Sequence, residues 1–397
     1  MDIQTNITGS SKRSTAFIIG WSGLFLLLFG CTNMLPGGPA AEISPDSLLA
    51  GVALGAIAAD SKAETLINDA DILGLSPQMS VFIDQNIDRD TNDYQRIRQL
   101  IFALMGDGSF RLQYNNQTQT ATETFNERHG NCLSFTNLFV AMARDIELKV
   151  SYQEVDIPPD WTTNDGTFTL NRHVNVHVDL GMAGGHVVDF NIGDFRTTYD
   201  RRIISDERAL AHFFNNKGVE HLQDGDTGAA LANLQRALHS DRTFAPAWSN
   251  LGTLYRRQGL LVHAEASYLQ SLAVNSSEYV AMSNLASLYT QTGDSERAAL
   301  FEKKVRRHRM RNPYYRFDLA KQAFLQRDYD TAISNLEFAI RRKELEDSFH
   351  FLLGLSYLQK GDEKKARKLL QKAEELAQSD ALKRNYQSKI DLLLSAE

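Results

Sequence analysis

The stretch APAWSNLGTLYRRQGLLVHAEASYLQSLAVNSSE, residues 245–278, is one unit of a pattern that recurs every 34 residues in the C-terminal half of the chain. In each unit the eighth and twentieth residues are small, so two antiparallel helices can approach each other closely. The units begin at residues 211, 245, 279, 313 and 347, the eighth residues are Gly218, Gly252, Ala286, Ala320 and Gly354, and the twentieth are Ala230, Ala264, Ala298, Ala332 and Ala366. A fixed period of this length predicts a solenoid of stacked helix pairs.

Large residues occupy other fixed positions of the same units. The seventh residue is Leu251, Leu285, Leu319 and Leu353 in four units, and the eleventh is Tyr255, Tyr289 and Tyr357 in three. Together, the small and large positions resemble the tetratricopeptide repeat (TPR), and the resemblance covers residues 211–380 without an insertion. The third unit fits least well, because Glu302 stands where the family usually has an aromatic residue.

The resemblance implies an all-α TPR solenoid over residues 206–397, closed by an amphipathic capping helix at Ala381–Leu394. Such solenoids bind a protein or peptide partner on their concave surface. Asn216, Asn250 and Asn284 share the sixth position of successive units, and a ladder of amides that both donate and accept would bind an extended peptide backbone. The alternative is that asparagine is simply common at this position in the family.

Length and charge exclude several classes of protein. At about 150 residues per domain, 397 residues predict two to three domains, and 43% apolar residues exclude a largely disordered chain. The formal net charge of -7 argues against a nucleic-acid partner. The basic run EKKVRRHRMR, residues 302–311, is then either a solvated helix face or a docking patch for an acidic partner or anionic headgroups.

The cysteine content narrows the possibilities further. Two cysteines exclude a disulfide scaffold and a zinc site built from four cysteines of one chain. The sequence also contains no nucleotide-binding loop, no dinucleotide fingerprint and no zinc-protease helix motif. We therefore expect no cofactor and no metal.

The N-terminal segment has the pattern of an export signal. Two basic residues, at positions 12 and 13, precede an apolar run over residues 16–30, which is short for a transmembrane helix of about 20 residues. The run ends in Leu28-Phe29-Gly30-Cys31, which resembles the bacterial lipobox. The resemblance implies a lipoprotein signal peptide over residues 1–30 and acylation of the Cys31 thiol.

Acylation of Cys31 would anchor the protein to a membrane of the bacterial cell envelope, since two or three acyl chains give stable attachment. Thr32 follows the cysteine, and the absence of aspartate there resembles the outer-membrane sorting pattern, with the protein facing the periplasm. Residues 31–60, which begin rich in proline and glycine, are predicted as a tether. The alternative is an uncleaved anchor or an ordinary signal that contains Cys31.

A domain with mixed helix and strand patterns is predicted over residues 61–205. Within it, Cys132 follows the turn Gly130-Asn131 and precedes a stretch, 133–144, whose apolar residues fall on one helical face. Cys132 is therefore expected at the start of a helix. Backbone N–H groups and the helix dipole favour a thiolate there.

Two predicted strands carry the partners that a nucleophilic thiol needs. Residues 173–180 (HVNVHVDL) alternate strictly, a glycine-rich turn follows, and residues 186–190 (HVVDF) form the return strand. Cys132, His173 and Asp189 thus occur in the order of a nucleophile, a base and an orienting carboxylate.

These residues resemble the transglutaminase-like (papain-like) superfamily over roughly residues 75–200. Gly130-Asn131-Cys132, His173 and Val188-Asp189 match its motifs, whereas Asn175 stands where many relatives carry an aromatic residue. The resemblance implies an α+β domain that performs acyl transfer through Cys132, His173 and Asp189. The backbone N–H of Cys132 and the side chain of Gln119 are the candidate oxyanion donors.

Other roles for these residues stay open at this point. His177 and His186 compete with His173 as the base. A zinc site would use His173, His177 and Asp189, with His186 as a spare ligand, but it would leave the placement of Cys132 unexplained. Taken alone, Cys132 could also be a small buried apolar residue.

The sequence therefore predicts an envelope-anchored, thiol-dependent acyl-transfer enzyme. It would be a protease or amidase if water resolves the acyl-enzyme, and a transglutaminase-like cross-linker if an amine does. The repeats would recruit a protein substrate or partner. The alternatives are a non-catalytic adaptor with a degenerate thiol domain, and a peptide-binding sensor.

Overall fold

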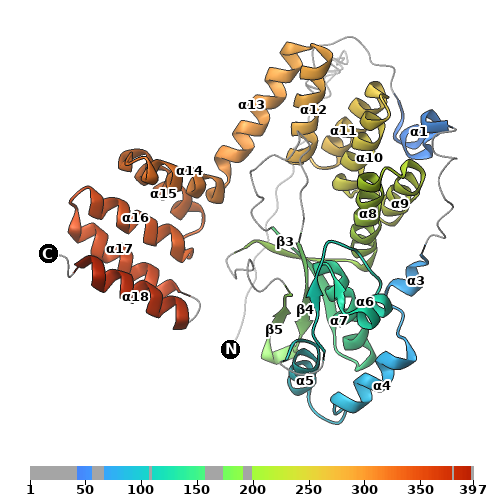
Figure 1. The fold of residues 1–397 in the computed structure, drawn as a ribbon, viewed down its shortest axis with the longest axis horizontal. Helices are drawn as coiled ribbons and strands as arrows, with labels where there is room; N and C mark the ends of the chain where they lie inside the picture. Colours follow the sequence, from blue (N-terminus) through green and yellow to red (C-terminus); the bar gives the residue numbers. More distant parts are fainter. Residues whose placement is uncertain are drawn as a thin grey trace, which may run out of the picture. The chain divides into compact units, whose positions relative to one another are not determined.

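The computed structural model describes residues 43–55, 67–106, 110–156, 173–190, 199–377 and 380–394 (Figure 1). The predicted signal peptide and the predicted acylation site, Cys31, lie outside these ranges. None of the helices in the described ranges combines the length and the apolar character needed to cross a membrane.

Short helices lead into the first domain, and polar side chains set where they begin. They are α1 (Pro45–Ala50), η1 (Val52–Leu54), α3 (Asp69–Ile72), α4 (Pro77–Asn86), α5 (Asp93–Met105) and α6 (Ala121–Glu127). Ser44, Ser76 and Asn92 each accept a hydrogen bond from a backbone N–H of the following first turn. Thr120 and Glu123 form a reciprocal capping box at α6.

The domain is built on an antiparallel sheet of four strands in the order β5-β4-β3-β6. The strands are β3 (Val150–Val155), β4 (His173–Asp179), β5 (Gly185–Val188) and β6 (Arg201–Ile204), and a separate parallel pair joins β1 (Gln113–Tyr114) to β2 (His129–Gly130). The apolar residues of β4, Val174, Val176 and Val178, are all buried, and of the alternating polar residues His173 and Asn175 are buried too. In the antiparallel pairing of β3 with β4, His173 lies opposite Val155.

Helix α7 (Cys132–Asp145) is the central helix of this domain. It lies beside the sheet (Figure 1), and residues 133–143 are all buried. Phe135 and Phe139 contact the ring of Phe190 edge-on. A helix buried over nearly all its length holds its first residue, Cys132, in a fixed place.

A solenoid of helix pairs follows, with the spacing that the sequence predicts. The pairs are α8 (Asp206–Asp224) with α9 (Thr227–Ser240), α10 (Ala245–Arg257) with α11 (Leu261–Val274), α12 (Tyr279–Thr292) with α13 (Ser295–Arg311), α14 (Pro313–Leu325) with α15 (Tyr329–Arg342), and α16 (Asp347–Gln359) with α17 (Glu363–Leu376). Helix α18 (Asp380–Leu394) follows the last pair. The small eighth residue is required sterically, because a Cβ on Gly252 would lie 2.6 Å from the ring of Tyr268.

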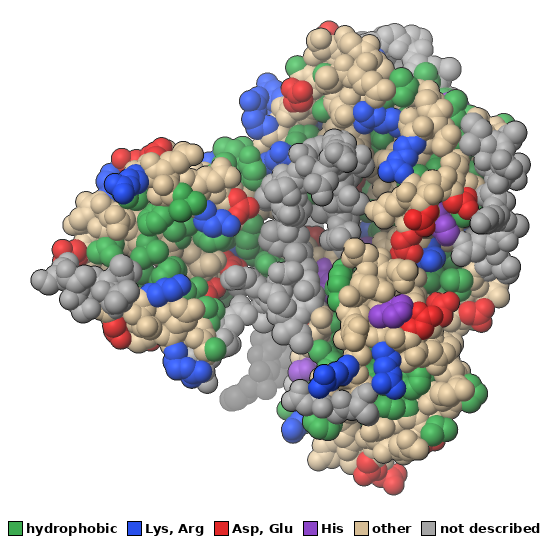
Figure 2. All heavy atoms as spheres, viewed as in Figure 1, with side chains coloured by type: hydrophobic (Ala, Val, Ile, Leu, Met, Phe, Trp, Pro, Cys, Tyr) green, Lys and Arg blue, Asp and Glu red, His purple; other side chains and the backbone are tan. Residues whose placement is uncertain are grey.

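The third unit differs from its neighbours, as Glu302 suggests. One apolar core runs from the first domain to Phe301, and a separate core begins at Ala320. Glu302 is exposed, and the basic run extends α13 with the exposed residues Lys303, Lys304, Arg306, Arg307 and Arg311. Figure 2 shows basic side chains along this helix.

Part of the predicted tether is folded. Leu48, Leu49 and Leu54 are buried, and α1 packs on the solenoid (Figure 1). The hydroxyl of Tyr255 donates to the Leu48 carbonyl at 2.6 Å, and Gln235 donates to the Leu49 carbonyl at 2.7 Å. The structure therefore differs from the expected tether over residues 45–54, because three leucines gain burial against the repeats.

Candidate functional site

Cys132 is the first residue of α7 and is partly exposed. Asn131 caps the helix, since its side chain accepts from the Ser134 backbone N–H at 3.0 Å. The first turn of the helix therefore presents N–H groups and a positive dipole end at the thiol.

His173 is held between Asp189 and Cys132. Its Nε2 lies 2.8 Å from each carboxylate oxygen of Asp189, and both side chains are almost fully buried. Burial lowers the pKa of His173, but hydrogen bonds and charge interactions with Asp189 and Cys132 outweigh it and raise the pKa to about 9. Because Nε2 faces Asp189, the other ring nitrogen, Nδ1, is the one available to the thiol.

Asn175 completes this group, and the sequence pattern did not assign it. It is fully buried, and its Nδ2 donates to Asp189 Oδ2 at 2.7 Å. The sequence feature that could have identified Asn175 is its position two residues after His173, since residues two apart lie on the same face of a strand. The amide fixes the carboxylate that in turn fixes the imidazole.

Gln119, the candidate oxyanion donor, lies beside the turn that precedes Cys132. Its backbone N–H donates to Ser134 Oγ at 2.9 Å, and its side-chain amide donates to Glu127. A Cβ on Gly130 would lie 2.6 Å from the Cβ of Ser134 and 3.6 Å from Gln119 Oε1. Glycine at 130 thus lets this loop approach α7 closely.

Tyr114 lies near the Cys132 thiol. It pairs with Gly130 across the short β1–β2 ladder, and its side chain is 62% exposed. Partial burial of its hydroxyl and the charge of Cys132 raise the pKa of Tyr114.

The other histidines of the hairpin lie in different surroundings. The His177 ring covers Gly185, because a Cβ there would lie 2.2 Å from His177 Nε2, and His186 is exposed. Among the described residues, no group of three or more His, Cys, Asp or Glu side chains is placed to hold a metal ion. Of the three candidates for the base, His173 is the one that lies against Asp189 and whose pKa is raised by Cys132.

The three asparagines of the predicted ladder have unequal surroundings. Asn284 is buried, whereas Asn216 and Asn250 are half-buried. Asn250 Nδ2 donates to Asn215 Oδ1 at 2.8 Å, so its partner in the first unit is Asn215. The amides therefore do not form a ladder that is exposed along its whole length.

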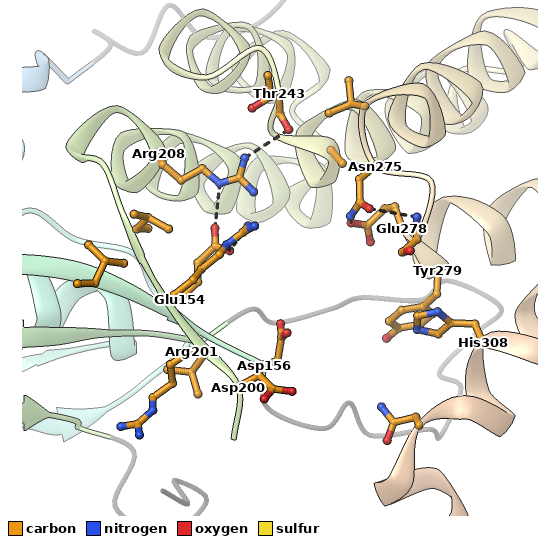
Figure 3. Close-up of a pocket in the computed structure, with 18 of the residues that line it drawn as sticks. Glu154, Asp156, Asp200, Arg201, Arg208, Thr243, Asn275, Glu278, Tyr279 and His308 are labelled. Atoms are coloured by element: carbon orange, nitrogen blue, oxygen red, sulfur yellow. Dashed lines mark hydrogen bonds and ion pairs between the residues drawn. The ribbon is translucent and has the colours of Figure 1, made fainter. Parts of the chain in front are cut away.

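A pocket of about 950 Å³ lies between the sheet and the solenoid. The end of β3, strand β6, the start of α8, the start of α12 and the α13–α14 junction line it. Figure 3 shows Tyr279 and His308 stacked together on one side, with ring centroids 5.5 Å apart, and Asp156 and Asp200 on another. The pocket reaches Val155, the residue paired with His173.

Glu154 joins the sheet to the first repeat helix beside this pocket. Its Oε1 lies 2.8 Å from His212 Nε2 and 2.9 Å from Arg208 Nε, and its Oε2 accepts from Arg202. Burial raises the pKa of Glu154, but the hydrogen bonds and charges of His212 and Arg208 hold it well below its usual range.

Comparisons with known families match both parts of the chain. The family model of the transglutaminase-like superfamily matches residues 82–181, and that of the tetratricopeptide repeat matches residues 215–278 and 317–381. The chain therefore contains a transglutaminase-like domain near the N-terminus, followed by a helical TPR solenoid, and the predicted fold class is confirmed. The third unit, with Glu302, falls between the two matched TPR segments.

Solved structures with similar helical repeats include a MamA protein, which is 20% identical, with a TM-score of 0.24 over 42% of this chain and 91% of that chain. YrrB, described as a TPR protein with an unusual peptide-binding site, is 17% identical. The match covers 45% of this chain and 92% of YrrB, with a TM-score of 0.24. MamA from Desulfovibrio magneticus RS-1 is 17% identical over 42% and 94%, with a TM-score of 0.24. Among curated proteins, none matches the chain significantly.

Proposed function

We propose that the protein is a thiol-dependent acyl-transfer enzyme that acts on protein or peptide amides. The observation that carries this proposal is the arrangement of Cys132, His173 and Asp189, in which the buried Asp189 carboxylate lies 2.8 Å from one nitrogen of an imidazole whose pKa the neighbouring Cys132 also raises. A nucleophile, a proton carrier and an orienting group are what acyl transfer requires. The TPR solenoid supports a protein or peptide as the partner.

The proposed chemistry has two steps. Cys132 Sγ attacks the amide carbonyl carbon, the C–N bond breaks, and His173 gives its proton to the departing amine, which leaves a thioester on Cys132. Water or a second amine then gives a proton to His173 and attacks the thioester carbonyl carbon. The C–S bond breaks, and Cys132 leaves as the thiolate beside the protonated His173, which restores the starting state. Water yields a carboxylic acid and a protease or amidase, while an amine yields a new amide and a cross-linker. We favour hydrolysis, because water is always present.

The negative oxygen formed in each step needs donors. The backbone N–H of Cys132 lies at the helix start, and the Gln119 side chain lies beside Gly130 in the turn that precedes it. One hydrogen of the Gln119 amide is directed to Glu127, which leaves the second for the substrate oxygen.

A non-catalytic adaptor is the second candidate. The contact between Gln119 and Glu127 favours it, because a carboxylate beside the oxyanion position opposes negative charge there. In this case the repeats would assemble protein partners, and the thiol domain would be a structural module. The proposed acyl transfer and the adaptor role make opposite predictions for substitution of Cys132.

Thiol labelling tests the proposal directly. We expect iodoacetamide to modify the folded protein at Cys132, and the labelling to disappear in Cys132→Ala. His173→Ala should slow labelling near pH 7 at least tenfold, while His186→Ala, an exposed histidine of the same hairpin, should leave it unchanged. The proposal also predicts release of peptides from fluorescein-labelled casein, or incorporation of dansylcadaverine into casein, only when Cys132 is present. Folded protein with an unreactive Cys132 would contradict it and favour the adaptor.

We also propose that the protein is a lipoprotein anchored through Cys31 to the bacterial envelope, facing the periplasm from the outer membrane. The support is the lipobox-like ending of the apolar run before Cys31. Expression with radiolabelled palmitate should label the wild type but not Cys31→Ser, and the variant should leave the membrane fraction. Equal labelling of both proteins would exclude acylation at Cys31.

A further inference from the structure

The first repeat helix, α8, contacts the thiol domain on both sides of the catalytic group. Near its C-terminal end, Glu220 Oε1 accepts from the Thr118 backbone N–H at 2.7 Å. Glu220 Oε2 lies 3.1 Å from Lys217 Nζ, and these two side chains are about one-fifth exposed. A carboxylate of the repeats thus binds the residue next to Gln119.

Thr118 connects Glu220 to Asn131, the residue that caps α7, the helix that begins with Cys132. It is buried, and its Oγ1 accepts from Asn131 Nδ2 at 2.7 Å. Asn131 Oδ1 accepts in turn from the Ser134 backbone N–H at 3.0 Å, which fixes the first turn of α7. Ser134 Oγ accepts from the Gln119 N–H at 2.9 Å. Each of these hydrogen bonds involves a residue within two positions of Cys132, and the last one also involves Gln119, the candidate oxyanion donor.

The same helix also holds the strand pair that carries the base. Arg208 and His212 of α8 bind Glu154, which pairs with Val174 in the sheet. The next residue pair along these strands contains His173. Helix α8 therefore contacts the nucleophile side of the site through Glu220 and the base side through Arg208 and His212.

We propose that Glu220 is a positioning residue for acyl transfer and that the first TPR helix is thereby part of the catalytic apparatus. The inference rests on the proposed function. Glu220 acts through Thr118 and Asn131, because a lost acceptor would leave the buried Thr118 N–H without a partner and would free the loop that holds Gln119. The repeats are then required for the acyl-transfer step as well as for recruitment.

Three variants of the full-length protein test this role. Glu220→Ala removes the acceptor, Glu220→Gln keeps a carbonyl oxygen for Thr118, and Lys217→Ala breaks the neighbouring ion pair but leaves the Thr118 contact in place. Circular dichroism identifies any variant that fails to fold. We expect Glu220→Ala to increase hydrogen exchange at the Thr118 amide about tenfold and to lower kcat for casein about tenfold with little change in KM. Glu220→Gln should restore most of both values, and Lys217→Ala should resemble the wild type.

The pH profile of Cys132 alkylation by iodoacetamide separates this proposal from the proposed function. One outcome is that the wild type shows no turnover while Glu220→Ala changes the alkylation profile and Glu220→Gln restores it. In that case Glu220 still positions the thiol, and the proposed acyl-transfer function is wrong. If a folded Glu220→Ala protein keeps the wild-type alkylation profile and amide exchange, or if Glu220→Gln behaves like alanine, the positioning role is overturned.

Discussion

The two carboxylate oxygens of Asp189 lie equally close, at 2.8 Å, to Nε2 of His173, in a part of the protein that is almost closed to water. Burial alone would favour a neutral imidazole, yet Asp189 and Cys132 raise the pKa of His173 to about 9. The imidazole is therefore charged at neutral pH. A charged imidazole is ready to give a proton to a departing amine and stabilises a neighbouring thiolate.

This relationship predicts a pH-dependent stability. The folded pKa of His173 lies above the ordinary value of 6.5, so its contribution is fully present below pH 6.5 and is lost as pH rises through about 9. Asp189→Asn should remove the charge that holds this proton. We expect the free energy of unfolding of Asp189→Asn, measured in urea, to be about 3 kcal/mol lower than that of the wild type below pH 6.5. This difference should shrink above pH 9. A deficit that is constant with pH would show that Asp189 does not raise the pKa of His173.

Asn175 should matter to catalysis because it orients the carboxylate. Loss of its hydrogen bond to Asp189 should cost about 1.5 kcal/mol, the low end for a bond to a charged group, or about tenfold in kcat. Asn175→Ala is measured against Asn137→Ala, which removes another buried amide, one bonded to Tyr152 and not to Asp189. Equal losses of kcat in the two variants would mean that Asn175 acts only through general stability.

Local patterns were enough to predict much of this molecule. The strand β4 and the four later repeat starts follow from spacing along the chain, and the structure has a strand at His173–Asp179 and helices that begin at 245, 279, 313 and 347. Cys132, His173 and Asp189 could be chosen as a candidate triad from the sequence, because each lies in or directly after a helix or strand whose position the local pattern predicts.

Contacts between distant segments could not be predicted in this way. Glu220 and Thr118 are 102 residues apart, and their hydrogen bond depends on how the solenoid packs against the thiol domain. Asn175 appeared only as a departure from the family pattern, because its role needs the neighbouring strand in register. The burial of Leu48 likewise depends on a surface of the repeats that no local pattern describes.

Glu154 should be a major source of stability between the two domains. Glu154→Gln would leave His212 buried beside a neutral amide and Arg208 with Asp241 as its remaining carboxylate partner. Loss of one partner of a buried ion pair costs about 3 kcal/mol or more. The folded pKa of Glu154 is lowered, so this stabilisation is present above its ordinary value of 4.5 and is lost as pH falls below it. Urea unfolding at pH 7 should therefore separate the wild type from the variant, and the gap should narrow in acid.

The control for Glu154 is the more exposed pair between Arg144 and Asp206, which also joins the thiol domain to α8. Its charges remain in water, so Asp206→Ala should cost less than about 1 kcal/mol. A loss from Asp206→Ala as large as that from Glu154→Gln would mean that burial does not decide the strength of these contacts.

The packing of the repeat helices gives a prediction that is independent of the proposed catalytic site. A Cβ on Gly252 would lie 2.6 Å from the Tyr268 ring, so Gly252→Ala should overpack the helix pair and lower stability by about 1–3 kcal/mol, despite the better helix propensity of alanine. The fourth unit combines Ala320 with Leu336 at the corresponding positions. The double variant Gly252→Ala, Tyr268→Leu should therefore recover part of the loss relative to Gly252→Ala alone, even though Tyr268→Leu removes a buried ring. Urea midpoints of the two single variants and the double variant give this coupling directly. If the two losses simply add, the clash between position 8 and the following helix is not what requires glycine in this unit.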